Sequence, residues 1–209
     1  MGRPATKHEE RKGQIINAAL DVFAAKGYDG TTNRLIAEAA GLHSAALIYH
    51  YFPSKTDLFK ACLERSTALE DLKRDLTTGQ EKPPEVYLKK VAMSYLRTLS
   101  GKPVNRLFLM VLAAAQSHPE LMPILMGRLS EVVFFPLLTY FTRQTAEGRL
   151  RPISPVTAAQ ELLGPLMLRA IAGALFEESL PFVFQDDEDF IDTHVKVFLD
   201  GIRSRGEKE

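Results

Sequence analysis

The sequence has little of several things that would narrow its chemistry. Of its 209 residues one is cysteine and none is tryptophan, and 26 lysines and arginines are balanced by 26 aspartates and glutamates. A single cysteine, Cys62, excludes an internal disulfide and is compatible with a reducing cytosol. Because the formal net charge is zero, no overall positive field draws the chain to nucleic acid or membrane, and any nucleic-acid binding requires a local basic patch.

The sequence also gives no indication of segments that would place the chain in a membrane. We find no apolar run that approaches the ~18 residues of a membrane-spanning helix, and the amino terminus lacks the apolar segment of a signal peptide. We therefore expect a cytoplasmic protein that has no membrane partner. With 45% apolar and 25% charged residues, the chain can bury a sizeable core.

Motifs for catalysis and metal binding are absent. The five histidines are scattered, and there is no His-Glu-x-x-His, no Gly-x-Ser-x-Gly and no glycine loop for phosphate. The acidic run from Asp186 to Asp189 precedes an expected helix, where negative charge suits the positive end of the helix dipole. We interpret it as a cap and predict no enzyme, no cofactor and no metal site.

What is present is a helix-turn-helix pattern between Thr31 and Leu58. Thr32 can cap a first short helix, and Gly41 can end it because glycine adopts the left-handed backbone conformation without a Cβ penalty. A second short helix is expected from 44 to 51. In such a motif the second helix can enter a DNA major groove.

This stretch resembles the DNA-binding half of the TetR (tetracycline-repressor) family. The matching positions are Ile15, Ala18, Ala19, Phe23, Gly27, Tyr28, Thr32, Ile36, Ala37, Ala40, Gly41, Tyr49, His50, Tyr51, Phe52, Ser54, Lys55 and Leu58. One residue more than the family pattern stands between Gly41 and Tyr49, so counting from either end assigns different groove-facing residues. The segment from about 106 to 198 resembles the family's carboxy-terminal region less specifically.

The whole chain is predicted to be all-α, with an N-terminal three-helix helix-turn-helix domain and a larger C-terminal helical domain for ligand binding and dimerisation. We place the first domain at 1–54 and the second at 77–209, joined by one long helix, 55–76, whose start carries the capping box Ser54 and Asp57. Other helices are expected at 9–26, 85–99, 104–116, 120–126, 128–147, 156–178 and 190–203. Pro136 and Pro165 fall inside two of them and should kink them.

The predicted DNA-binding residues follow from the motif. The resemblance implies backbone contacts for Tyr49 and Lys55, and a lysine in the first turn of its helix makes sense beside a bound phosphate. His50 and Thr32 are further backbone candidates. The candidates for base edges are His43, Ser44, Ala45 and Ala46, since serine pairs with either type of partner and alanine can contact a thymine methyl.

Two groups of residues near the motif are expected to have roles other than direct contact through the recognition helix. Leu47 and Phe52 are expected to pack the core. The basic residues of the first twelve can form a flexible arm toward DNA, although a merely solvated terminus is an equal alternative; they are Arg3, Lys7, Arg11 and Lys12.

The C-terminal half offers candidates for an apolar pocket and a dimer surface. Flexible and aromatic side chains can line an adaptable pocket, and a few polar ones can orient a ligand, although plain core packing is the stronger alternative for each apolar residue. The pocket candidates are Met93, Leu96, Arg97, Met110, Gln116, Phe134 and Met167. In the resemblance the last two long helices form a four-helix bundle across a two-fold axis. The dimer candidates are Leu162, Leu166, Ala170, Phe190, Val197 and Phe198.

The resulting prediction is a ligand-responsive repressor that binds a palindromic operator in double-stranded DNA as a homodimer and is released by a small, mostly apolar effector. The alternative is a helical small-molecule-binding protein without specific DNA binding, which the zero net charge and the extra residue after Gly41 keep open.

Overall fold

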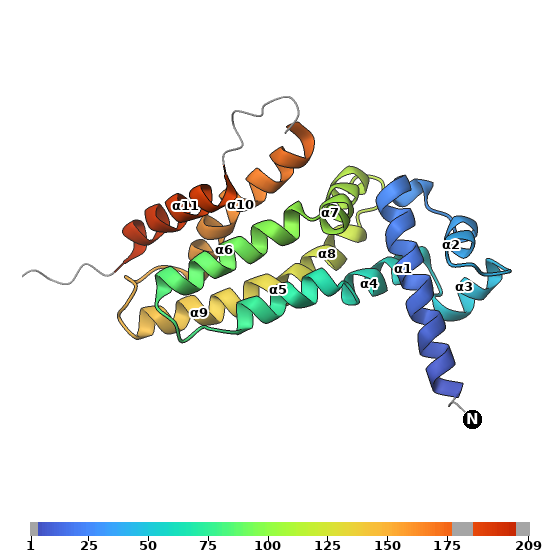
Figure 1. Cartoon of the computed structure of the whole chain (residues 1–209), viewed down its shortest axis with the longest axis horizontal. Helices are drawn as coiled ribbons and strands as arrows, with labels where there is room; N and C mark the ends of the chain where they lie inside the picture. Colours follow the sequence, from blue (N-terminus) through green and yellow to red (C-terminus); the bar gives the residue numbers. More distant parts are fainter. Residues whose placement is uncertain (1–3, 177–185, 204–209) are drawn as a thin grey trace, which may run out of the picture. The chain divides into compact units, whose positions relative to one another are not determined.

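The computed structural model describes residues 4–176 and 186–203, which form helices connected by short turns (Figure 1). Within these residues the only extended pairing is a single antiparallel bridge between Leu150 and Arg203. The predicted all-α fold is confirmed. The helices are α1 Pro4–Gly30, α2 Asn33–Ala39, α3 Ala46–Tyr51, α4 Lys55–Glu64, α5 Thr67–Thr77, α6 Pro84–Ser100, α7 Lys102–Ala114, α8 Leu121–Leu129, the π-helix η1 Ser130–Phe134, α9 Phe135–Ala146, α10 Pro155–Phe176 and α11 Asp187–Ile202.

The chain divides into two compact units. The first unit comprises residues 1–67 and 106–128, and the second comprises 68–105 and 129–209. The predicted division into 1–54 and 77–209 assigns 106–128 to the carboxy-terminal domain, whereas in the structure these residues group with the amino-terminal helices. The predicted domain roles stay a prediction.

The core of the first unit explains why α1 to α4 form one body. Helix α1 packs against α2 and α4, and α2 packs against α3. The fully buried rings of Phe23 and Phe59 meet edge to face with their centroids 5.7 Å apart, and Tyr28 stacks on Phe23 at 5.8 Å. Gly27 breaks the helical path of α1 with φ 72°, a conformation that favours glycine. The helix expected at 9–26 therefore lies within α1, and Gly27 interrupts α1 directly after it.

The expected single helix 55–76 is wrong, because the structure has two helices, Lys55–Glu64 and Thr67–Thr77. No glycine or proline marks the break. Each helix instead packs in its own unit, with Cys62 and Leu63 buried in the first and Leu69 and Leu72 in the second. Tertiary packing therefore overrides the helix propensity of this stretch.

Helices α5, α6, α9, α10 and α11 make up the second unit. Helix α6 lies at its centre and packs against α10 and α11, while α10 also packs against α9. The rings of Tyr87 and Tyr140 lie 4.1 Å apart between α6 and α9, and both are fully buried. The Tyr87 hydroxyl donates a hydrogen bond to the Leu76 carbonyl at 2.7 Å, and burial raises its pKa to about 12.

The helices expected at 120–126 and 128–147 are one continuous run from Leu121 to Ala146. The turn η1 widens the helix so that the Phe135 amide donates to the Ser130 carbonyl, five residues back. Pro136 follows directly, and the wider turn accommodates a residue that has no amide hydrogen to donate. Pro165 stays inside α10, which continues through it.

The continuous run corrects the expectation about membrane segments. The stretch from Leu121 to Ala146 is long and apolar enough by composition to cross a membrane, although this test is also passed by core helices of soluble proteins. In the second unit its side chains Val132, Leu137 and Phe141 are buried among the other helices. A core helix therefore accounts for its composition.

Candidate nucleic-acid interface

Local signals fix the path of the backbone through the helix-turn-helix. The Thr32 hydroxyl accepts the Leu35 amide at 3.3 Å and caps α2, as predicted. Gly41 takes a positive φ of 61°, and the next amide, of Leu42, donates to the Ala37 carbonyl at 2.8 Å. This five-residue return is the hydrogen bond that commonly closes a helix ended by glycine. Gly41 thus ends α2 as expected.

The second helix of the motif begins two residues later than predicted. Helix α3 runs from Ala46 to Tyr51, so His43 and Ser44 belong to the turn and Ala45 is the residue before the helix. The Ser44 hydroxyl accepts the Ala46 amide at 3.2 Å. This bond lies within the turn, because Ala45, the residue directly before the helix, has no side-chain capping bond.

The outer side of α3 and its preceding turn is solvent-exposed. Tyr49 is 63% exposed, whereas its neighbour Ile48 is 1% exposed and fills the core. The predicted residues His43, Ser44, Ala46 and His50 are exposed, and Ala45 is half-buried. Phe52 is buried as predicted.

Leu47 corrects the sequence analysis. We expected it to pack the core, but it is 37% exposed on the outer side of α3. A six-residue helix turns little more than one and a half times, so few of its residues can face inward. Ile48 takes that place, which leaves Leu47 beside the base-edge candidates.

Lys55 is engaged within the first unit. Its ammonium donates to the Tyr28 carbonyl at 2.8 Å and to the Thr31 carbonyl at 3.3 Å, and it lies 4.2 Å from the centroid of the Tyr28 ring. Ser54 caps α4 by accepting the Asp57 amide at 3.0 Å, as predicted. In place of the second bond of a capping box, which would come from the Ser54 amide, the Ser54 hydroxyl donates to the Asp57 carboxylate at 2.6 Å. The lysine therefore joins the start of α4 to the end of α1, a role that its sequence position does not reveal.

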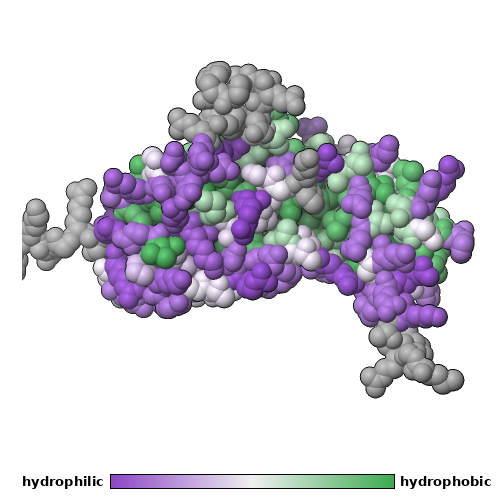
Figure 2. Space-filling view, in the orientation of Figure 1, coloured by the Kyte–Doolittle hydropathy of each residue, from purple (hydrophilic) through white to green (hydrophobic). Residues whose placement is uncertain are grey.

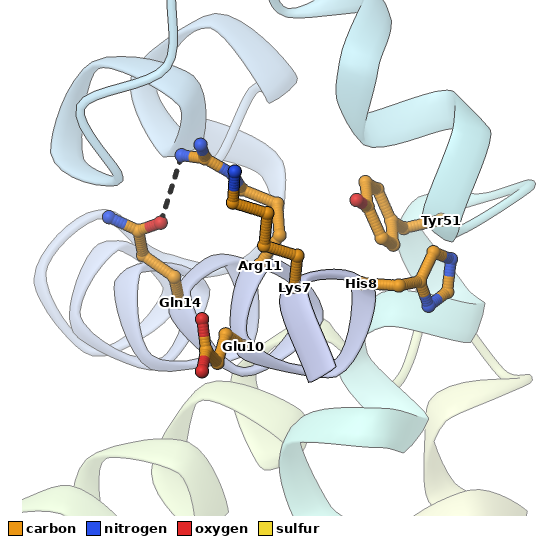
Figure 3. A pocket seen from close by; sticks show the side chains of 6 residues that line it. All are labelled: Lys7, His8, Glu10, Arg11, Gln14 and Tyr51. Carbon is orange, nitrogen blue, oxygen red and sulfur yellow. Dashed lines mark hydrogen bonds between the residues drawn. The ribbon is translucent and has the colours of Figure 1, made fainter. Parts of the chain in front are cut away.

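An open notch of about 660 Å³ is lined by residues Lys7 to Gln14 of α1 and by Tyr51 at the end of α3 (Figure 3). The imidazole of His8 and the phenol of Tyr51 lie against each other with centroids 4.7 Å apart, and His50 meets Tyr51 edge to face at 5.5 Å. The side chains of Lys7 and Arg11 project beside them. The Glu10 carboxylate also lines the notch, so its charged groups are two cations and one anion. Aromatic surface with an excess of positive charge suits a phosphate backbone.

The notch also corrects the predicted flexible arm. Lys7, Arg11 and Lys12 are residues of helix α1, and the Arg11 guanidinium donates to the Gln14 side chain at 3.0 Å. Arg3 lies outside the described residues. The sequence analysis placed neither His8 nor Tyr51 in the interface. Residues four positions apart lie on the same face of a helix, so the sequence of α1 could have indicated that Lys7 and Arg11 lie together.

The predicted pocket residues do not share one environment. Leu96 and Met110 are buried, Met93 and Phe134 are half-buried, and Met167 is 37% exposed. Gln116 is exposed and lies in the first unit together with Met110, whereas the other candidates belong to the second. The structure does not bring the seven candidates together within one unit.

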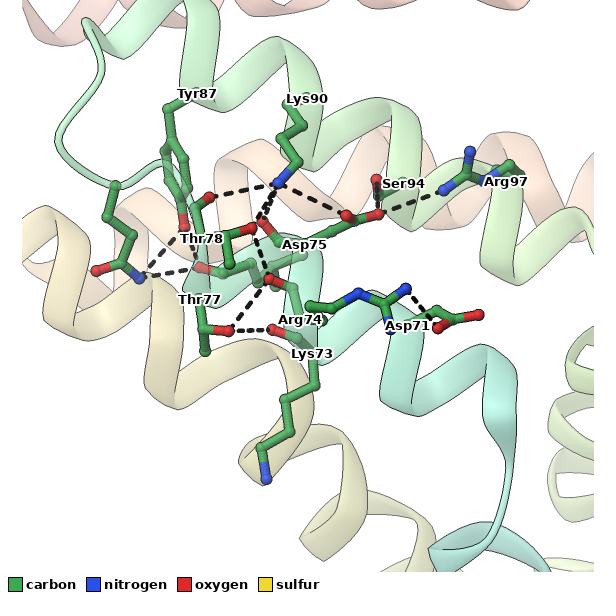
Figure 4. Close-up of polar contacts among 12 residues, drawn as sticks. Asp71, Lys73, Arg74, Asp75, Thr77, Thr78, Tyr87, Lys90, Ser94 and Arg97 are labelled. Atoms are coloured by element: carbon green, nitrogen blue, oxygen red, sulfur yellow. Dashed lines mark hydrogen bonds and ion pairs between the residues drawn. The ribbon is translucent and has the colours of Figure 1, made fainter.

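Arg97 has a different role from the predicted one. It is exposed and lies 3.3 Å from the Asp75 carboxylate, which also accepts the Ser94 hydroxyl at 2.6 Å and pairs with Lys90 at 3.5 Å (Figure 4). The hydrogen bond from Ser94, aided by both cations, holds the pKa of Asp75 below its usual value despite an opposing effect of burial. This cluster joins α5 to α6.

The dimer candidates split into two groups. Leu162, Leu166 and Ala170 are buried within a single chain, so their assignment to a dimer surface is wrong. The stripe that these three residues form along α10 faces the core of the second unit instead. Val197 is 66% exposed, Phe190 is half-buried and Phe198 is 8% exposed.

A different side of α10 and α11 carries the exposed apolar residues. Figure 2 shows apolar side chains reaching the surface among hydrophilic ones. On these two helices the exposed large apolar residues are Val156, Met167, Leu168, Leu175, Phe176 and Val197. These residues make the outer side of the two helices a candidate interaction surface.

Two further predictions concern reactive groups. Cys62 is fully buried, its thiol faces the Ile16 carbonyl at 3.6 Å, and burial raises its pKa to about 12, so it is an inert packed thiol. The Asp186 carboxylate accepts the Glu188 amide at 2.6 Å and caps α11, as predicted. Over residues 4–176 and 186–203 no three His, Cys, Asp or Glu side chains are grouped as metal ligands.

Comparison with known families covers both units. The family described as "Bacterial regulatory proteins, tetR family" matches residues 15–62, and "AefR-like transcriptional repressor, C-terminal domain" matches residues 87–201. The first match spans the helix-turn-helix and α4. The second spans more than half of the chain.

Individual relatives agree with these matches. The HTH-type transcriptional regulator RutR of Escherichia coli O157:H7 is 27% identical over 215 residues, covering 98% of this chain and 96% of that protein. A TetR-family regulator structure from Mesorhizobium loti MAFF303099 superposes with a TM-score of 0.77 at 24% identity, covering 93% of this chain and 98% of the other. The structure of the flavonoid-responsive regulator FrrA gives 0.71 at 26% identity, with 95% and 100% covered.

Proposed function

The chain belongs to the TetR family of helix-turn-helix regulators, and from that premise we propose that it is a cytoplasmic transcriptional repressor. It binds a palindromic operator in double-stranded DNA as a homodimer, and a small, mostly apolar effector releases it. The observation that carries the proposal is the exposed side of α3 and its turn, held by buried residues such as Ile48 and Phe52.

The residue types on that side suit the major groove. The groove is about 12 Å wide, and a helix with its side chains is about 10–12 Å across. Ser44 can pair with donor or acceptor edges, and Ala46 and Leu47 can contact a thymine methyl. None of the exposed residues offers the bidentate recognition of arginine or asparagine. We therefore expect discrimination to come largely from phosphate register and DNA shape.

Phosphate contacts are proposed for residues on either side of α3. Tyr49, His50 and Thr32 are exposed and polar, and the notch adds Lys7 and Arg11. These cations supply a local basic patch on a chain that has no net charge. We propose that Lys55 acts mainly through its bonds to the end of α1 and reaches a phosphate only in addition.

Dimerisation is proposed through the exposed apolar side of α10 and α11. A dimer binds two half-sites only if its recognition helices lie about 34–36 Å apart, one turn of DNA. An effector that binds better to a dimer of different spacing shifts the equilibrium away from DNA. FrrA is described as flavonoid-responsive, which supports a small-molecule effector for this chain at the level of a proposal.

A selection from random DNA duplexes tests the proposal. We expect enrichment of an inverted repeat and, for the selected duplex, a dissociation constant that rises steeply between about 50 and 200 mM salt, as counterion release requires. The control is a duplex with both half-sites scrambled. The alternative, a small-molecule-binding protein without specific DNA binding, predicts equal and weak affinity for both duplexes.

A further inference from the structure

His118 lies in the corner between α7 and α8, and its backbone is fixed on both sides. Its amide donates to the Ala114 carbonyl at 2.8 Å, and its carbonyl accepts the Leu121 amide at 3.1 Å. These residues group with the amino-terminal helices in the first unit. The His118 ring faces the end of α1.

The ring is held from three directions. Its Nε2 lies 2.6 Å from a carboxylate oxygen of Asp29, and its Nδ1 lies 3.2 Å from one of Glu120. The Tyr28 ring meets it edge to face, with centroids 4.6 Å apart. The Lys55 ammonium lies over that same Tyr28 ring. These are the titratable groups that face His118 from α1, from α4 and from its own loop.

This arrangement favours a proton on both ring nitrogens. A neutral imidazole has a single N–H, so one carboxylate would face a nitrogen lone pair, whereas an imidazolium donates to both. The hydrogen bond to Asp29, followed by that to Glu120 and by the charges of both carboxylates, raises the pKa of His118. The geometry and the electrostatics both favour the charged ring.

The contact between His118 and Asp29 lies at the corner between α1 and α2, where the helix-turn-helix begins. After the break at Gly27, the Thr31 hydroxyl donates to the Gly27 carbonyl at 2.6 Å, and the next residue, Thr32, caps α2. Lys55 donates to the Tyr28 carbonyl, and the Tyr28 hydroxyl is 2.9 Å from that of Thr56. Helix α4 thus holds one side of this corner, and His118 holds the Asp29 side.

We propose that His118, in its charged form, is a positioning residue that keeps this corner ordered and so holds α2 and α3 in the arrangement that binds DNA. The inference rests on the proposed function. If this corner is already ordered in the free protein, less conformational entropy is lost when DNA binds. Loss of the His118 proton therefore weakens the affinity for DNA. Since the folded-state pKa is raised, the stabilisation is complete below the unfolded value of about 6.5 and is lost as the pH rises through the folded value.

The first measurement follows the histidine rings of the free protein by nitrogen–proton NMR between pH 5 and 9. We expect the His118 ring to titrate at higher pH than in a variant carrying Asp29→Asn and Glu120→Gln. Asp29 is 73% exposed and Glu120 is 47% exposed, so both substitutions leave the core intact. An unchanged titration in the variant would overturn the proposal.

The second measurement is the dissociation constant for the selected duplex at pH 6 and pH 8, at constant ionic strength. The candidate interface also contains His8, His43 and His50, so the informative quantity is the difference between the wild type and His118→Gln. We expect the wild type to lose about fivefold more affinity than this variant over the interval, a coupling at the low end of the usual range. The double carboxylate variant should behave like His118→Gln.

The matched control is His194→Gln, which removes a half-buried histidine of the second unit whose Nε2 lies 2.8 Å from the Leu162 carbonyl. Its pH profile should follow the wild type. Equal profiles for the wild type and His118→Gln would overturn this inference and leave the proposed function standing. Failure of the wild type to bind any duplex at either pH would overturn both.

Discussion

The two units differ in how well the sequence indicates which of their residues are exposed and which are buried. In the first unit the candidate interface lies on one short helix and its turn, where Tyr49 is exposed beside the buried Ile48. In the second unit the long helix α10 buries Leu162 but exposes Leu168. The contrast between Tyr49 and Ile48 lies within a motif of fixed spacing. The contrast between Leu162 and Leu168 depends on which neighbouring helices cover α10, and this is decided only when the unit is packed.

The largest expected effect comes from comparing two leucines of α10, one buried and one exposed. Leu162→Ala removes a fully buried side chain and should lower the free energy of unfolding by about 2–5 kcal/mol, because it leaves a cavity. The matched change Leu168→Ala, at a position 68% exposed, should keep the thermal stability of a single chain but weaken association of two copies. Urea unfolding and sedimentation measure the two effects. A strong dimer defect in Leu162→Ala without loss of stability would restore the original assignment.

The next effect concerns the Asp75 cluster between α5 and α6. Asp75→Asn should cost about 1–3 kcal/mol of unfolding free energy at pH 7, because charged hydrogen bonds are lost. Since the folded-state pKa of Asp75 is lowered, its contribution is present above the unfolded value of about 3.9 and is lost as the pH falls through the folded value.

Urea unfolding at several pH values checks this account of Asp75. The stability difference between the wild type and Asp75→Asn should be constant above about pH 5 and should shrink on acidification. Asp71→Asn is the control, because that carboxylate pairs with Arg74 at an exposed site and should matter little. A difference that grows below pH 4 would contradict the assignment of the lowered pKa.

A smaller effect is expected at the start of α4. Ser54→Ala removes the cap on the Asp57 amide and should lower stability by about 1 kcal/mol. Ser117→Ala, at an exposed serine outside any helix, should change it by less than about 0.5 kcal/mol. Thermal unfolding of the two variants measures the contrast, and equal shifts would mean that the capping bond contributes nothing.

Much of the fold could be predicted because its signals are local. Thr32, Gly41 and Ser54 each mark a helix end by the chemistry of a single residue, and all three act as expected. The break between α4 and α5 carries no such residue, and it arises because each half packs in a different unit. The expected helices 120–126 and 128–147 leave out Gly127, whereas the observed helix passes through this residue.

The candidate site could be predicted in part for the same reason. The motif located α3 and most of its exposed residues, but the true inward residue was Ile48 alone, so Leu47 was misplaced. Lys55 contacts backbone carbonyls 24 or more positions away in sequence, and His118 contacts Asp29, which is 89 positions away. Spacing along one helix cannot reveal such contacts. They become visible only when the helices are packed.

The central claim is that the exposed side of α3 meets DNA, and Ala46→Asp tests it most directly. An acidic residue in the first turn of a helix suits the helix dipole, so the fold should keep its thermal stability. Its charge would face the phosphates, and we expect the affinity for the selected duplex to fall by about a hundredfold or more, since like charges placed together at an interface cost several kcal/mol. Val86→Asp, in the exposed first turn of α6, is the control and should bind as the wild type does. Undiminished binding by a folded Ala46→Asp variant would contradict the account.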